Sequence, residues 1–260
     1  MPETTISRDP GSPASCTALP RTPRPDRFRS RIGADAAGGF YPAPRRYELF
    51  LSARGPQSRR VAVTLDLLGL RDTVFTTVVP AAPHEAAAPA ALRAAYEATW
   101  HGYDGPLTVP ALCDRWTGRV VSNHTPDILR DLAGRLGDAA RLCPLDLATE
   151  IGTVRDLVEQ DIARPAEEAA TAAPADRAKA LEQLLTALNL LDRRLACAPG
   201  PYALGERLTA ADVDLWVALS DLPDGVLSPY RHLAAYVRRL PRQYAAFGFP
   251  RPEERTTQGG

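Results

Sequence analysis

Hydrophobic and polar positions divide the chain into a mixed first part and a helical second part. Residues 46–52 alternate large apolar residues with other positions, which predicts a mostly buried strand. A helical pattern follows and ends at Gly69, and residues 73–79 are rich in β-branched residues, which predicts a second strand. Strand, helix and strand in this order predict a right-handed parallel crossover.

The next segment predicts a helix, a β-hairpin and a further helix. Residues 92–100 carry a short helical pattern, and residues 108–114 and 119–122 bracket a turn, as in a hairpin. Pro110 lies within the first arm, which requires an edge position or a special geometry. Thr125 as N-cap, followed by a proline, predicts a helix after the hairpin.

From about residue 144 the pattern is helical throughout. The helical stretches are residues 145–170, 174–196, 209–222 and 232–244. Thr209 with Asp212 three residues later predicts a capping box at the start of the third stretch. We therefore expect an α/β domain at residues 40–136 followed by an all-helical domain at residues 144–247.

Both ends of the chain lack these patterns. Residues 1–39 mix prolines with Ser, Thr and Arg, which predicts a disordered N-terminal extension. Residues 248–260 are polar and predict a flexible tail.

Composition narrows the classes of function. The 31 basic residues balance 31 acidic ones, which argues against a nucleic-acid binder that depends on phosphate neutralisation. Lys179 is the single lysine, and the abundance of Ala, Arg and Pro indicates a GC-rich genome. No run of about 18 apolar residues and no apolar signal core occur, so we expect a cytoplasmic protein that does not contact membranes.

Cysteines and histidines predict neither disulfides nor a metal site. The cysteines are far apart and form no CxxC pair; they are Cys16, Cys113, Cys143 and Cys197. The histidines show no metal-ligand spacing; they are His84, His101, His124 and His232. We interpret Cys113 as a small buried hydrophobic residue.

Three segments carry a resemblance to a known family. Residues 28–32 read FRSRI, residues 46–60 read RYELFLSARGPQSRR, and residues 120–130 read VVSNHTPDILR. With the proline of the third strand and the helical second half, they resemble the glutathione S-transferase superfamily. More narrowly, they resemble its Xi class, the glutathionyl-hydroquinone reductases, over about residues 28–245. The resemblance implies a thioredoxin-like domain before the all-helical domain, a cis peptide at Val109–Pro110, and a homodimer.

The departures from this family fall on its chemical residues. The family's nucleophilic cysteine precedes the turn proline, where this chain has Gly55, so attack of a protein thiolate on a glutathionyl substrate has no nucleophile. The family's tryptophan and histidine after that proline are Gln57 and Arg59 here. The glutamate and serine that hold the γ-glutamyl end of glutathione are His124 and Thr125. Thr125 keeps a hydroxyl that could meet an anion at a helix N-terminus.

Three residues are candidates for catalysis. Ser58 could donate to a bound thiolate or enolate, and the alternative is a plain N-cap. His124 could act as acid or base near neutral pH, and the alternative is a polar residue before a helix. Tyr103 resembles a family tyrosine that lines the electrophile pocket, and the alternative is packing.

Other candidates would bind the ligand. Three arginines around the turn could bind an anion. The expected ligand-binding residues are Arg54, Gly55, Pro56, Gln57, Arg59, Arg60, Val109, Pro110 and Thr125. We expect the main concave site where these residues meet Tyr103 and His124, between the two domains.

The leading hypothesis is a divergent glutathione-transferase-like enzyme that acts on a small organic electrophile, aromatic or quinone-like. Without the cysteine it would act as a transferase for an external thiol, or as a lyase or isomerase through elimination, isomerisation or cyclisation. The thiol would be of low molecular weight, and mycothiol is favoured over glutathione because the γ-glutamyl clamp is lost. A role in actinobacterial specialised metabolism fits the composition. The alternative is a catalytically lapsed fold that serves as a binding or structural protein.

Overall fold

A four-stranded sheet organises the first part of the chain in the computed structural model, which describes residues 28–33, 39–53, 55–79 and 90–244. The strands are Tyr47–Ser52 (β1), Phe75–Val79 (β2), Ala111–Asp114 (β3) and Arg119–Ser122 (β4). Their order is β2-β1-β3-β4. The parallel pairing of β1 with β2 and the antiparallel pairing of β3 with β4 confirm the predicted crossover and hairpin.

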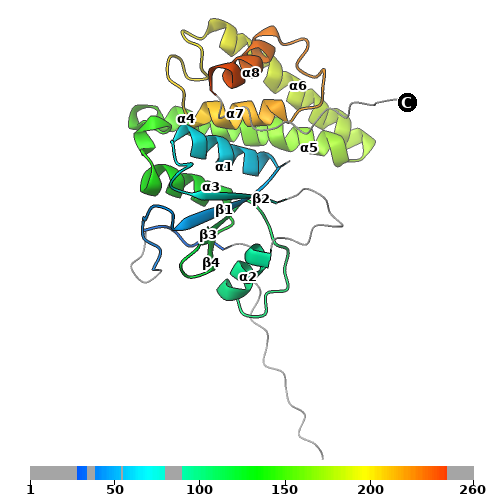
Figure 1. Cartoon of the computed structure of the whole chain (residues 1–260). Coiled ribbons are helices and arrows are strands. Elements are labelled where there is room, and N and C mark those ends of the chain that lie inside the picture. Colours follow the sequence, from blue (N-terminus) through cyan, green and yellow to red (C-terminus); the bar gives the residue numbers. More distant parts are fainter. Residues whose placement is uncertain (1–27, 34–38, 54, 80–89, 245–260) are drawn as a thin grey trace, which may run out of the picture.

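Helices cover both faces of this sheet. They are Pro56–Leu67 (α1), Ala90–Thr99 (α2) and Thr125–Asp131 (α3). Figure 1 shows α1 and α3 on the face turned toward the helical domain and α2 on the opposite face. Burial alternates less along β1 than predicted, because Phe50 is also buried. It belongs to a second hydrophobic cluster, which includes side chains of α2.

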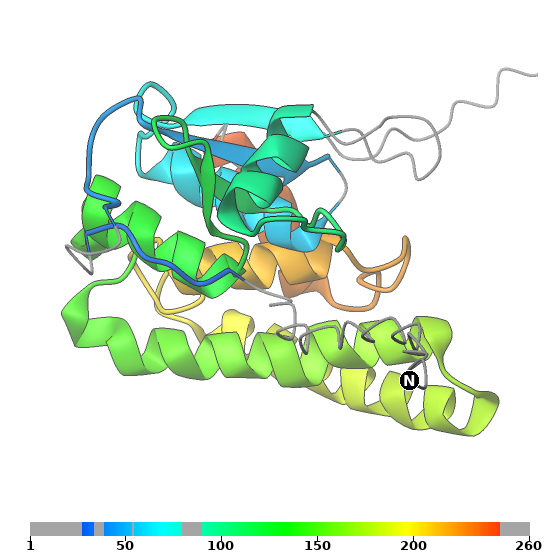
Figure 2. The ribbon, with the colours of Figure 1, turned by 90° about the horizontal axis from the view of Figure 1, so that it is seen from below.

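The second part of the chain is helical, as expected. Its α-helices are Ala148–Leu157 (α4), Arg164–Thr171 (α5), Pro174–Cys197 (α6), Ala210–Ser220 (α7) and Arg231–Gln243 (α8). This arrangement confirms a thioredoxin-like domain followed by an all-helical domain. The predicted single helix at 145–170 is wrong in detail, because the π-helical segment Val158–Ala163 separates α4 from α5. Pro165 follows that segment and has no N–H to donate to a regular helix. Seen from below, α4 and α5 still continue one another (Figure 2).

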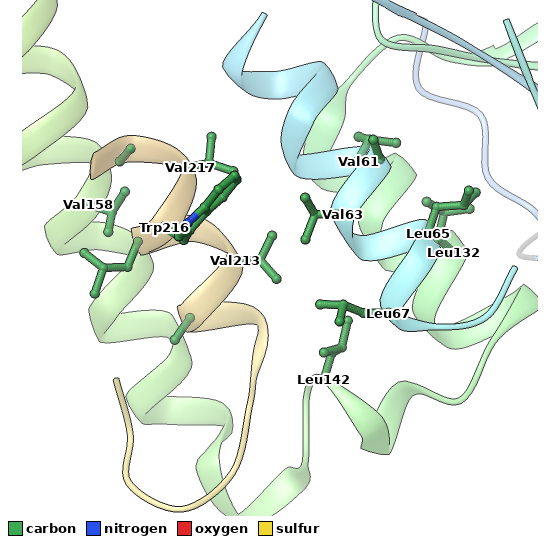
Figure 3. Close-up of a cluster of buried hydrophobic side chains, with 14 of the residues drawn as sticks. Val61, Val63, Leu65, Leu67, Leu132, Leu142, Val158, Val213, Trp216 and Val217 are labelled. Carbon is green, nitrogen blue, oxygen red and sulfur yellow. The ribbon is translucent and has the colours of Figure 1, made fainter. Parts of the chain in front are cut away.

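The centre of the molecule is the contact between α1 and α7. Side chains of α7 from Ala211 to Leu219 are all buried. Val63 of α1 lies opposite Val213 and Val217 of α7 (Figure 3), within one continuous core cluster. Because α1 packs against the sheet on its other side, it joins the two domains.

The predicted capping box begins α7. The Thr209 N–H donates to Asp212 Oδ2 at 2.9 Å. Asp212 Oδ1 also accepts from the Ala203 N–H at 2.7 Å and from the Tyr236 hydroxyl at 2.8 Å. Burial raises the pKa of this carboxyl despite the hydrogen bonds. The Asp212 carboxylate therefore also holds the loop before α7 and the helix α8 against the start of α7.

The structure corrects two boundaries. Residues 28–33 were expected in a disordered extension, but Phe28 and Ile32 are buried, and the Ile32 N–H donates to Asp131 Oδ2 at 2.9 Å. The rest of the predicted extension lies mostly, and the predicted tail entirely, outside the described residues. Pro110 was placed inside a strand, but β3 begins one residue later, and the Val109–Pro110 peptide is cis as expected.

A buried ion pair lies at the end of the sheet where β1 begins and β3 ends. Arg46 is 2% exposed and Asp114 is fully buried, and two hydrogen bonds of 2.8 Å join the guanidinium to the carboxylate. The guanidinium also lies 4.2 Å from the centre of the Tyr41 ring. Burial alone would raise the pKa of Asp114, but hydrogen bonds from Arg46, Thr117 and the Trp116 N–H hold it below its usual range.

We predict that Asp114→Ala lowers the free energy of unfolding by about 3–5 kcal/mol, because it leaves a buried guanidinium without its partner. Exposed Glu97→Ala on α2 should change it by about 0.5 kcal/mol or less. Because folding lowers the pKa of Asp114, its stabilisation is present above the unfolded pKa of about 3.9 and is lost as the pH falls through the folded value. Urea unfolding at pH 7 and pH 3 measures both effects. Equal losses for the two variants at pH 7 would contradict the role of the pair.

Candidate functional site

The turn between β1 and α1 holds the position of the family's nucleophile. Gly55 is the N-cap of α1, with φ −84° and ψ 131°, and Pro56 is the first helical residue. Pro56 and Gln57 are exposed. Ser58 is buried, and its Oγ accepts a hydrogen bond from the Ser52 N–H at 2.9 Å. Ser58 is therefore not the N-cap that we considered as an alternative; it joins the end of β1 to the start of α1.

Gly55 leaves space beside two serine side chains. A Cβ atom there would lie 3.7 Å from Ser52 Cβ, 3.8 Å from Ser58 Oγ and 3.9 Å from Ser52 Oγ. These are ordinary contacts, and the backbone of Gly55 is extended, so a Cβ atom fits this position without backbone strain. Because Gly55 has no side chain, the space that a Cβ atom would fill is empty beside Ser52 and Ser58.

The strand register brings three segments together at one end of the sheet, where β1 ends. Phe50 pairs with Ala111, so Val109–Pro110 lies beside the end of β1, where the turn begins. Leu112 pairs with Ser122, so His124 emerges from β4 near the same edge. The turn, the cis peptide and the start of α3 therefore lie at the same end of the sheet.

His124 is paired with a carboxylate at the start of α3. His124 is the N-cap of this helix, so the assignment of Thr125 as N-cap is wrong by one residue, and Thr125 is buried in the first turn. His124 Nδ1 lies 3.0 Å from Asp127 Oδ2, and Arg29 Nε donates to the same oxygen at 2.8 Å. The hydrogen bond from Arg29, with a further contribution from His124, holds the pKa of Asp127 below its usual range although burial opposes it.

Arg59 and Arg60 do not face the turn as anion ligands, contrary to the sequence-based expectation. Arg60 Nε lies 2.9 Å from Asp214 Oδ1, and Arg59 Nη1 lies 3.8 Å from Asp221 Oδ1. Both carboxylates belong to α7 or its C-terminal end, so these charges are used between the domains. Arg54, the third arginine of that prediction, lies outside the described residues.

Tyr103 occupies an aromatic cluster. Its ring centre lies 5.0 Å from that of Tyr96 and 5.8 Å from that of Phe28. Its hydroxyl donates to the Pro106 carbonyl at 2.9 Å, and the side chain is buried. This position supports packing, the alternative interpretation, and we do not include Tyr103 in the proposed site.

Sequence reasoning missed the carboxylates that orient the basic side chains. Asp127 follows His124 by three residues, a spacing that places both on one side of a helix start. Asp214 lies within the apolar run of α7, and a charge inside such a run signals a buried partner. Either signal was available in the sequence.

No thiol of the described residues lies at the turn. Cys113 is buried in β3, where burial raises the pKa of its thiol to about 12, and Cys143 and Cys197 lie in the helical half. Across the described ranges, no cluster of three or more side chains could hold a metal ion. None of the described helices is both long and apolar enough to cross a membrane.

The ion pairs between α1 and α7 generate a matched prediction. Asp214 is 2% exposed and also accepts a hydrogen bond from Arg155 Nε at 2.9 Å, whereas Asp221 is 45% exposed. We expect Asp214→Asn to lower the free energy of unfolding by about 3 kcal/mol. Asp221→Asn should lower it by about 1 kcal/mol or less, because its pair is solvated. Urea unfolding of both variants compares them, and similar losses would refute the central role of Asp214.

Comparison with known proteins agrees with this architecture. The family model of the glutathione S-transferase C-terminal domain matches residues 167–239. Glutathionyl-hydroquinone reductase PcpF of Sphingobium chlorophenolicum is 26% identical in an alignment 209 positions long that covers 73% of this chain and 66% of that protein. Glutathionyl-hydroquinone reductase YqjG of Escherichia coli is 27% identical in an alignment 226 positions long that covers 74% of this chain and 66% of that protein. The chain thus matches slightly less than two thirds of the length of these relatives.

Solved structures share the fold. A glutathione transferase from Gordonia bronchialis superposes with a TM-score of 0.73 at 27% identity, covering 82% of this chain and 75% of that one. The Xi transferase of Phanerochaete chrysosporium has a TM-score of 0.71 at 24% identity, covering 87% of each chain, and supports the fold alone. In its two domains and in these matches, the chain is similar to the glutathione S-transferase superfamily, with residues 167–239 matching its C-terminal domain, and within it to the Xi-class glutathionyl-hydroquinone reductases.

Proposed function

We propose that this chain is a transferase that joins an external low-molecular-weight thiol to a small quinone-like electrophile. The observation that carries the proposal is the open space at Gly55, at the N-terminus of α1 and beside Ser58. The sulfur of a thiol cosubstrate would occupy the place that the family gives to its cysteine sulfur. The names of the relatives, glutathionyl-hydroquinone reductases, support a thiol and a quinone-like substrate class.

Ser58 would stabilise the thiolate. Its oxygen accepts the Ser52 N–H, and its own proton is the group that could donate to a sulfur near Gly55. Such a hydrogen bond, together with the positive end of the α1 dipole, favours the anionic form of the thiol.

His124 would move the proton. The adjacent Asp127 carboxylate is ionised at neutral pH because its pKa is lowered, and it orients the imidazole. His124 takes the proton of the incoming thiol, the sulfur bonds to a ring carbon of the quinone, and the electron pair moves to the carbonyl oxygen. That oxygen then receives the proton. The hydrogen on the attacked ring carbon leaves as a proton and the second carbonyl oxygen is protonated, so thiol and quinone combine into a thioether hydroquinone with no further oxidant or reductant.

The identity of the thiol is part of the proposal. We favour mycothiol because His124 stands where the family carries the glutamate that pairs with the γ-glutamyl ammonium. Loss of one charge-assisted hydrogen bond of about 1.5–3 kcal/mol weakens glutathione binding by roughly 10- to 100-fold. Low-micromolar glutathione binding by calorimetry would instead make glutathione the preferred cosubstrate.

We also propose a cytoplasmic homodimer, which light scattering would refute by reporting a 28.1 kDa particle.

The first test follows thiol consumption above the uncatalysed rate with a methoxy-substituted benzoquinone. Mycothiol, glutathione and no thiol are compared, and mass spectrometry identifies the product. We expect His124→Ala to lower kcat/KM by about 100-fold, as for loss of general acid–base catalysis. His232→Ala is the control, because His232 Nδ1 also lies 3.0 Å from a carboxylate, that of Asp192, in the helical domain.

The outcomes separate the hypotheses. A similar loss in both histidine variants would refute the role of His124. Conversion without thiol would replace the transferase with a lyase or isomerase. Binding without any turnover would favour the alternative, a catalytically lapsed binding protein.

A second prediction concerns the missing nucleophile. Gly55→Cys should leave the melting temperature within a few degrees, since a Cβ atom at this position makes only ordinary contacts. The new thiol at the helix N-terminus should have a lowered pKa and alkylate with iodoacetamide at pH 6.5 about tenfold faster than the thiol of Gly152→Cys. Gly152 lies inside α4, and a Cβ atom added there would have no neighbour within 4 Å, so this position supplies an ordinary thiol. Equal alkylation rates would show that the turn does not activate sulfur.

A further inference from the structure

A second cavity lies at the opposite end of α1 from Gly55. It is open to solvent, has a volume of about 600 Å³ and is lined by the end of α1, the 3-10 turn Ala139–Arg141, the loop before α7 and the end of α8. It therefore sits at the junction of the two domains, where ligand sites often occur. With 12 residues in α1, the helix separates it from the turn by about 18 Å.

The floor of this cavity is apolar. Leu67 and Leu142 are 8% and 2% exposed, and Leu208 is half-buried beside them. Figure 3 shows Leu67 of α1 and Leu142 near one another at this end of the helix. Such a floor fits an aromatic ring or a short alkyl chain.

The rim carries one uncompensated positive charge. Arg71 forms an ion pair with Asp66, so these two charges cancel. Arg141 is exposed on the same rim and forms no ion pair within the described part of the chain. The remaining guanidinium is free to bind an anion, and a carboxylate matches its geometry.

Gln243 and Tyr244 complete the lining of the cavity. Tyr244 lines it, and its hydroxyl lies 2.6 Å from that of Tyr202. The hydrogen bond from Tyr244 and burial raise the pKa of Tyr202 to about 12, so this hydroxyl is neutral at physiological pH and adds no negative charge. The cavity thus combines an apolar floor, one cation without an ion-pair partner among the described residues, the neutral amide of Gln243 and one tyrosine.

We propose that this cavity is a second ligand site, for a small amphipathic carboxylate whose apolar body rests on Leu67, Leu142 and Leu208 and whose anionic group pairs with Arg141. The proposal does not depend on the reaction at the Gly55 turn. It adds a binding site for an apolar organic acid at the other end of the helix that joins the domains.

The test uses 2-naphthoate as the probe and measures its binding to the full chain by isothermal calorimetry. We expect micromolar to submillimolar affinity, weakened at least tenfold by Arg141→Glu. Arg119→Glu is the matched control, because Arg119 is an exposed arginine at the start of β4, and it should bind like the wild type. Circular dichroism and melting temperature show whether each variant is folded.

Two further measurements test whether binding requires the carboxylate and whether it occurs at this cavity. The neutral analogue 2-naphthalenemethanol should bind more weakly than naphthoate to the wild type and equally to wild type and Arg141→Glu. His124→Ala should leave naphthoate binding unchanged, which separates this cavity from the proposed catalytic site. No binding at 1 mM probe, equal weakening by both arginine variants, or loss in His124→Ala would each overturn the proposal.

Discussion

The position of α1 depends on the buried carboxylate of Asp214. It pairs with Arg60 of α1 and accepts a hydrogen bond from Arg155 of α4. One side chain of α7 therefore connects the sheet domain with two helices of the helical domain, α4 and α7. A charge this deep is stabilising only when its partners are in place, which restricts α1 to one orientation. In that orientation, α1 begins at the turn of Gly55 and ends beside the second cavity.

Features set by neighbouring residues could be predicted from the sequence, and features set by distant ones could not. The capping box of Thr209 and Asp212 is local, and the hairpin follows from the short turn between its two arms, so both were correctly predicted. Arg59 and Arg60 are adjacent to the turn in sequence, yet the contact with α7 decides where they point. Phe28 was assigned to a disordered extension because its partners, Tyr96 and Tyr103, lie far along the chain.

The candidate site divides in the same way. Its location at one end of the sheet follows from the strand order, of which the sequence predicted the parallel crossover and the hairpin but not the pairing of β1 with β3. The pairing of His124 with Asp127 was detectable from its helical spacing, but the bond between Ser58 and the Ser52 N–H required the three-dimensional path of the turn. Shared fold therefore places the site, while the chemistry depends on side chains in which this chain departs from the family pattern.

The burial of Cys113 has a consequence for handling reactive substrates. Electrophiles such as quinones modify thiolates, and a thiol with a pKa of about 12 is almost entirely protonated in neutral water. Within the described part of the thioredoxin-like domain, an electrophile arriving at the turn meets no protein sulfur able to capture it. Under the proposed function, the protein would present a soluble thiol to such a compound at a turn where no cysteine of the described residues lies.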